Sequence, residues 1–135
     1  MIESAEEFVR LRMSEKQAEY TRAAHDEASL EVWIKVIENY PDMAVWVAQN
    51  KTIPYEILEL LADHSENRVR SMVASKNKLK EPLMLKLAVD TDEAVRMSIV
   101  RHKKATLKVL TLLLNDTWCE ISDKASERIH NGSHK

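Results

Sequence analysis

Apolar residues recur along this chain with the spacing of helix faces. Val69, Met72 and Val73 lie at positions i, i+3 and i+4, which is the spacing of one face of an α-helix. The segment from 81 to 89 shows the same pattern, and strict alternation of apolar and polar residues is absent. The chain also has a single glycine, although tight β-hairpins depend on glycine-containing turns. The pattern therefore predicts an all-α fold of short helices.

The helical pattern is repeated. Residues 69–74 match residues 95–100 at an offset of 26, in the order of apolar, small and polar positions. A shorter step of 24 extends the series upstream and aligns Trp33 with Ile57, so we expect Trp33 in the core. A period of this length is typical of helical repeat proteins, in which each two-helix unit buries its apolar face against its neighbours.

The repeat predicts one helical-repeat domain over residues 1–130 with polar end caps. Its parts are an N-terminal cap (1–15), four two-helix repeats (about 16–41, 42–66, 67–92 and 93–117), a C-terminal half repeat (118–130) and a frayed tail (131–135). Ser4 and Glu7 have the spacing of a capping box. Asp42 and Asp92 precede first helices of repeats, and we expect both to cap free backbone N–H groups.

One stretch of the second repeat nearly follows the phrase Val-Ala-x-Asn-x-x-x-Pro-x-x-x-Leu-x-x-Leu-Ala-Asp. The residues that carry it are Val47, Ala48, Asn50, Pro54, Leu58, Leu61, Ala62 and Asp63. In this phrase the chain resembles the leucine-rich repeat variant, a HEAT-like bacterial helical repeat. The resemblance implies a binding scaffold, and we expect a short right-handed α-solenoid (superhelix) of about four stacked two-helix repeats. Some members of that group carry a cysteine-rich iron–sulfur segment, but Cys119 alone cannot ligate a cluster.

Residue patterns typical of enzymes, metal sites and membrane proteins are missing from the sequence. The five histidines form no His-Glu-x-x-His pair, and the single glycine excludes the usual phosphate-binding loop. The carboxylates fall in equivalent turns of the repeats, where capping explains them. We therefore expect a non-enzymatic protein with no cofactor and no metal. One cysteine, no long apolar run and an acidic N-terminus predict a cytoplasmic protein without a membrane segment.

Charge is divided unevenly along the chain. Residues 1–66 carry a net charge of −8 and residues 67–135 carry +6. Basic residues gather in the turns inside the repeats, where equivalent positions predict a common rim; these are Lys51, Lys76, Lys78, Lys80, Arg101, Lys103 and Lys104. The helix dipole accounts for basic residues at helix C-termini but not for Lys80, which precedes a helix. A solvated rim and a binding rim both remain open.

Two further repeat positions have alternative readings. Arg70 and Arg96 are equivalent, and we expect each to form an ion pair with Asp63, Asp90 or a nearby acid, with ligand contact as the alternative. Trp46 occupies a repeat position at which the equivalent residues, Met72 and Ser98, differ in polarity. Either core packing or a partner contact fits it.

These patterns favour a non-enzymatic protein-binding scaffold of the adaptor or toxin-immunity type in a bacterial cytoplasm. The candidate partner-binding residues are Trp46, Gln49, Asn50, Lys76, Lys78, Lys80, Arg101, His102, Lys103 and Lys104. Trp46 would supply contact area, and the basic turns would steer an acidic partner. The alternative is nucleic-acid binding along the basic rim of residues 67–108, which holds 11 basic and 4 acidic residues. An enzyme with a cleft in its concave surface is the third class.

Overall fold

The computed structural model describes residues 1–134, which form ten α-helices and one short 3-10 helix. In chain order the elements are α1 (Ala5–Met13), α2 (Gln17–His25), α3 (Leu30–Asn39), η1 (Pro41–Met43), α4 (Ala44–Gln49), α5 (Tyr55–Leu61), α6 (Asn67–Ala74), α7 (Glu81–Leu87), α8 (Glu93–Arg101), α9 (Leu107–Leu113) and α10 (Cys119–His130). The only extended pairing in this range is an isolated bridge between Ile2 and Ala28. The predicted all-α class is confirmed.

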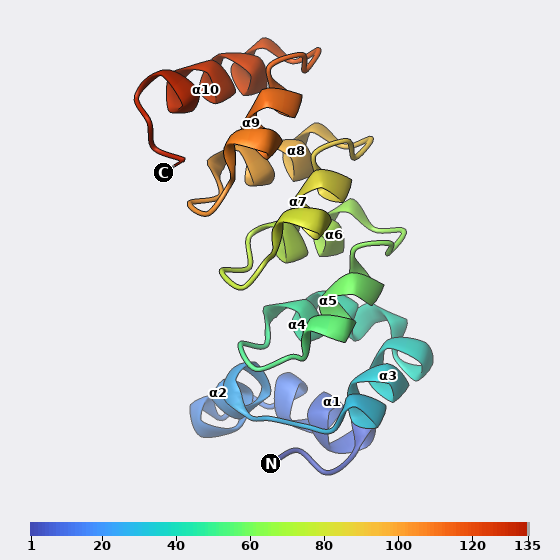
Figure 1. Cartoon of the computed structure of the whole chain (residues 1–135). Helices are drawn as coiled ribbons and strands as arrows, with labels where there is room; N and C mark the ends of the chain where they lie inside the picture. The colour runs from blue at the N-terminus through green and yellow to red at the C-terminus, as the bar shows by residue number, and fades with distance from the viewer. Residues whose placement is uncertain (135) are drawn as a thin grey trace. The chain divides into compact units, whose positions relative to one another are not determined.

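The chain folds into two compact units, Met1–Asp63 and His64–Lys135, which we call the N-terminal unit and the C-terminal unit. In the N-terminal unit, α1 packs on α2 and α3, and α4 packs on α2, α3 and α5 (Figure 1). Phe8 meets Trp33 edge to face, with ring centroids 5.2 Å apart. Both side chains are fully buried, so this aromatic pair forms the centre of the unit's core.

In the C-terminal unit, the first helices of the predicted repeats pack against each other, and so do the second helices. Helix α8 packs against α6 and α10, while α7 packs against α9. The α6–α7 and α8–α9 turns lie at one edge of the unit, and the α7–α8 and α9–α10 turns lie at the opposite edge (Figure 1). Every second turn therefore faces the same side.

Burial follows the 26-residue offset within the C-terminal unit. Val69, Val95 and Ile121 stand 26 residues apart on α6, α8 and α10, and all three are fully buried. The second helices behave alike, since Met84 and Leu110 are both buried at the same offset. Equivalent residues thus fill equivalent places in the core.

The step of 24 that aligned α3 with α5 is wrong by one residue. It pairs Val36 with Leu60, yet Val36 is fully buried and Leu60 is 49% exposed. A step of 25 pairs Trp33 with Leu58, and both are fully buried. The N-caps of the two helices, Ser29 and Pro54, also stand 25 apart. Because each residue turns a helix by about 100°, a slip of one position rotates the aligned face by that angle and sets some buried positions against exposed ones.

Helix caps agree with the sequence at two of three places. The Asp92 carboxylate accepts the backbone N–H groups of Ala94 and Val95 and caps α8. Ser4 caps α1 by accepting the N–H of Glu7, while the Glu7 carboxylate accepts the N–H of Glu3. The prediction for Asp42 is wrong, because this residue lies inside η1 and caps no helix through its side chain.

The chain past α10 forms a hydrogen-bonded turn as far as it is described. Ser133 donates its backbone N–H to Arg128 O, and Gly132 takes the left-handed conformation with φ at 74°, which glycine adopts without steric cost. Residues 131–134 of the predicted frayed tail belong to this turn, and Lys135 lies outside the described residues. Among the described helices, none has the length and apolar character needed to cross a bilayer.

Candidate partner-binding surface

Three polar residues are buried in the structure, and two of them are candidate contact residues. Asn50 is 0% exposed, His102 6% and Arg128 7%. His102 and Arg128 stand 26 residues apart, and Asn50 is two such steps before His102. All three therefore share one position of the repeat. Asn50 therefore offers no surface to a partner, and His102 offers little.

Asn50 closes the C-terminal end of α2. Its amide donates to Ala23 O at 2.8 Å and to Asp26 O at 3.0 Å. Its oxygen accepts the backbone N–H of Thr52 at 2.8 Å and the Thr52 hydroxyl at 2.7 Å. Carbonyls at a helix C-terminus lack partners within their own helix, so this side chain supplies the donors that α2 cannot.

His102 and Arg128 perform the same task in the C-terminal unit. His102 Nε2 donates to Lys76 O at 2.7 Å, because Nδ1 accepts the backbone N–H of Lys104 and so carries no proton. Arg128 Nη1 donates to Val100 O at 2.9 Å and to His102 O at 2.6 Å. Burial lowers the pKa of the Arg128 guanidinium. His102 thereby ties the α8–α9 turn to the α6–α7 turn, and Arg128 ties α10 to the C-terminal end of α8.

Arg70 and Arg96 form a second repeated contact. Arg70 Nε donates to Asp90 at 2.8 Å, and Arg96 Nε donates to Asp116 at 2.7 Å. The hydrogen bond to Asp90 raises the pKa of Arg70. The predicted ion pairs are therefore present. In each of them the arginine meets the acid 20 residues after it, Asp90 for Arg70 and Asp116 for Arg96.

Asp92 and Glu19 owe their lowered pKa values to hydrogen bonds. For Asp92, the bond from the Asn67 amide contributes most, and the backbone N–H groups at the start of α8 add to it. For Glu19, the Ser14 hydroxyl contributes most and Arg10 follows. All these contacts lie within the chain, so they account for the lowered pKa values without a ligand.

Four exposed lysines of the C-terminal unit lie in turns at one of its edges. Lys78 and Lys80 belong to the α6–α7 turn, and Lys103 and Lys104 belong to the α8–α9 turn; all four are exposed, while Lys76 is half-buried. The bond from His102 to Lys76 O holds the two turns side by side. We call these turns, together with Arg101, the basic edge.

The side chains of the α8–α9 turn are available to a partner. Arg101, Lys103 and Lys104 are exposed, and their charged groups form no ion pair or hydrogen bond within residues 1–134. Two acids of the opposite edge are engaged, since Asp90 and Asp116 hold the repeated arginines. A shallow depression of about 350 Å³ opens beside the basic edge; it is lined by Ser75, Asn77, Ser98, Arg101, His102 and Lys103.

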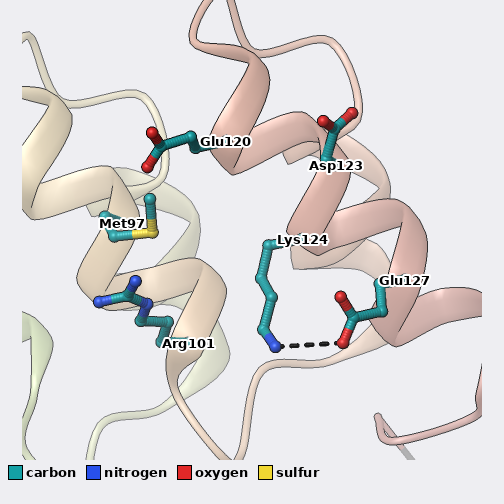
Figure 2. Close-up of a pocket in the computed structure, with 6 residues that line it drawn as sticks. All are labelled: Met97, Arg101, Glu120, Asp123, Lys124 and Glu127. Carbon is teal, nitrogen blue, oxygen red and sulfur yellow. Dashed lines mark hydrogen bonds and ion pairs between the residues drawn. The ribbon is translucent and has the colours of Figure 1, made fainter.

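A second depression of about 320 Å³ opens at the surface between α8 and α10. Figure 2 shows Met97 and Arg101 on the α8 side and four charged residues of α10 on the other, namely Glu120, Asp123, Lys124 and Glu127. Lys124 pairs with Glu127 at 3.3 Å. Both signs of charge line this groove, which is typical of a solvated surface.

The N-terminal unit holds the other two candidate residues, Trp46 and Gln49. Trp46 is half-buried and Gln49 is exposed. The Arg12 guanidinium covers the Trp46 ring, with Cζ 3.6 Å from the ring centroid. Gln49 joins Arg12, Tyr20 and His25 around a depression of about 410 Å³. Arg12 and His25 are not among the contact residues predicted from the sequence, because they lie in segments where the repeat pattern is weak.

Within residues 1–134, no three His, Cys, Asp or Glu side chains come together in a way that would hold a metal ion. Cys119 is exposed and free.

No protein-family model matches this chain, and no curated protein or solved structure is similar enough to count as a match. The functional conclusion therefore depends on the surfaces described above.

Proposed function

We propose that this chain is a non-enzymatic scaffold that binds an acidic protein partner through the basic edge of its C-terminal unit. The observation that carries the proposal is the contrast between the two edges of that unit. Two carboxylates on one edge, those of Asp90 and Asp116, are held by internal arginines, whereas Arg101, Lys103 and Lys104 on the other edge have no partner within residues 1–134. Exposed charges of one sign accelerate association with a partner of opposite sign.

The frame that carries these charges supports a HEAT-like repeat architecture for the chain. Arg70 and Arg96 make matching contacts 26 residues apart. His102 and Arg128 both donate to the carbonyl 26 residues before them. Repeated contacts of this kind are typical of solenoids, whose stacked units hold binding residues on a rigid surface. An adaptor or a toxin-immunity protein would use such a surface.

Nucleic acid is the second candidate, and the charge of the C-terminal unit favours it. Residues 64–135 carry 14 Lys and Arg against 9 Asp and Glu, a net charge of +5. The same residues include one aromatic side chain, Trp118. Single strands bind largely by stacking on aromatic rings, so duplex backbone contact is the form of binding that this surface suits.

Charge reversal on the basic edge tests the proposal. We suggest tagged protein in native cell extract, cross-linked and identified by mass spectrometry, for the wild type and the Lys103→Glu/Lys104→Glu variant. Lys16→Glu/Lys35→Glu is the matched control, because it makes the same change in net charge at exposed positions of the other unit. We expect a protein recovered by the wild type and the control, cross-linked through an acidic segment, and lost with the edge variant.

Two results would count against the proposal. One is failure of the wild type to recover any specific protein under several growth conditions. The other is equal recovery by the edge variant and the control. A mobility shift of duplex DNA or RNA that weakens about 10³-fold or more between 50 and 200 mM salt would favour nucleic acid instead.

A further inference from the structure

Arg12 differs from the other half-buried arginines of the described structure. Arg22, Arg70 and Arg96 each donate to a carboxylate. Arg12 has no ion pair or hydrogen bond within residues 1–134, and its Nε is buried without an acceptor. A buried donor without a partner is costly, so an acceptor from outside the chain would complete this site.

The surroundings of Arg12 hold further unused hydrogen-bonding groups. The depression of about 410 Å³ beside it is lined by Arg12, Tyr20, Thr21, Ala24, His25 and Gln49, from α1, α2 and α4. The side chains of Tyr20, Thr21, His25 and Gln49 form no hydrogen bond with other residues of the described chain. The volume lies within the range of small-ligand sites, and it is large enough for one side chain of a partner.

The depression has an unusual charge for its unit. Residues 1–63 carry 13 Asp and Glu against 6 Lys and Arg, yet no acid lines this depression. The surrounding field repels an extended polyanion such as a nucleic acid. A single oxyanion inside the depression meets a guanidinium and neutral donors, so the site suits one anionic group.

Trp46 fixes the orientation of the guanidinium. The ring lies against the face of Arg12 at 3.6 Å, and stacking of this kind leaves the N–H edge of a guanidinium free for two parallel hydrogen bonds. Arginine, tryptophan and tyrosine are also the residues that dominate binding energy at protein interfaces.

We propose that Arg12 binds a single carboxylate of a protein partner, with Trp46 holding the guanidinium and Gln49 and Tyr20 lining the site. This inference rests on the proposed protein-binding function and names a second contact point, in the N-terminal unit. The carboxylate belongs either to an Asp or Glu side chain or to the C-terminus of the partner.

Short peptides separate these two sources. The probes are acetyl-Ala-Glu-Ala-amide for a side-chain carboxylate, acetyl-Ala-Ala-Ala for a C-terminal one, and uncharged acetyl-Ala-Gln-Ala-amide as the reference. Binding is followed in the full chain by nitrogen-15 NMR at the Arg12 Nε–H and the Trp46 indole N–H, at constant ionic strength. We expect one carboxylate probe to shift both signals with an affinity on the order of millimolar, and the reference peptide to leave them unchanged.

Variants make the assignment specific to Arg12. Arg12→Gln, followed through the Trp46 indole, should weaken binding of that probe by about tenfold or more, since a charge-assisted hydrogen bond is lost. Arg10→Gln is the matched control, because Arg10 is exposed and pairs with Glu19; it should bind as the wild type does. Unchanged amide spectra elsewhere in each variant show that the fold is retained.

Several results would overturn the inference. They are the absence of a shift with both carboxylate probes, an equal shift with the reference peptide, an equal loss in both variants, or a response to inorganic phosphate alone. If these occur while the wild type still recovers a partner that Lys103→Glu/Lys104→Glu loses, only the Arg12 site fails and the proposed function stands.

Discussion

Replacing Asn50 with alanine tests the idea that a buried polar side chain holds the turns of the repeat. Asn50 is fully buried, and its side chain donates two hydrogen bonds to carbonyls and accepts two from Thr52 within the N-terminal unit. Asn50→Ala removes all four and leaves Ala23 O without the side-chain donor. Asp26 O keeps a hydrogen bond from Thr52 at 3.2 Å, so part of the loss is offset.

The expected cost follows from these contacts. Each hydrogen bond contributes about 0.5–1.5 kcal/mol net, and allowing for the partner that Asp26 O retains, we expect a loss of about 2–4 kcal/mol. Against a total stability of about 5–15 kcal/mol for a domain, this is a large fraction. With a urea dependence of about 2 kcal/mol per molar, the unfolding midpoint should fall by about 1–2 M.

The assay is equilibrium unfolding in urea, followed by circular dichroism and tryptophan fluorescence. Asn77→Ala is the matched control, because Asn77 is exposed in the corresponding turn of the next repeat; its effect should stay within about 0.5 kcal/mol. Asn50→Asp keeps the volume but sets an oxygen against two carbonyls, so it should be at least as destabilising as alanine. Equal midpoints for Asn50→Ala and Asn77→Ala would refute the reasoning.

Three further predictions concern other contacts of the same frame. A double-mutant cycle between Arg96 and Asp116 should give a coupling energy of about 1–3 kcal/mol in urea unfolding, because side-chain exposure is only 15% and 4%. The lowered pKa of Asp92 means that its stabilising effect is present above the ordinary value of 3.8 and is lost as pH falls through the folded-state pKa. Urea unfolding between about pH 6 and about pH 3 should therefore show a smaller loss of stability in Asp92→Asn than in the wild type. Trp33→Ala should cost about 3–5 kcal/mol in thermal or urea unfolding, because the fully buried ring leaves a cavity.

Each of these three predictions has a result that would contradict it. The Arg10–Glu19 pair, with side chains 57% and 30% exposed, should give a coupling energy below about 1 kcal/mol; a coupling as large as that of Arg96 and Asp116 would contradict the role given to burial. Parallel pH profiles for the wild type and Asp92→Asn would show that another carboxylate controls acid unfolding. Retention of wild-type stability by Trp33→Ala would mean that the core closes around the gap.

The sequence predicted the helices well because their pattern is local. Apolar spacing and repeated positions specify which face of α6 or α8 is buried, and the 26-residue offset predicts equivalent core residues such as Val69 and Val95. The alignment of α3 failed because the α2–α3 turn is one residue shorter than the α4–α5 turn, a difference that apolar spacing alone does not locate.

The candidate site was harder to predict because charge and polarity do not indicate burial. Asn50 and His102 look like surface residues in the sequence, but both turn inward to main-chain carbonyls of an earlier segment, at the end of α2 and in the α6–α7 turn. A signal was present, since the same repeat position holds Asn, Lys, His and Arg in turn, and each of these can donate a hydrogen bond. No such signal exists for Arg12, because its contact with Trp46 is between α1, in the cap segment, and α4, which lies much later in the sequence.

The carbonyl acceptors of Asn50, His102 and Arg128 have a consequence for how this chain can change in evolution. Three different side chains donate hydrogen bonds to main-chain carbonyl oxygens, and every amino acid supplies such an oxygen. A substitution of the residue that supplies one of these oxygens therefore leaves the contact in place, whereas a side-chain pair such as Thr106 with Glu81 depends on both residues.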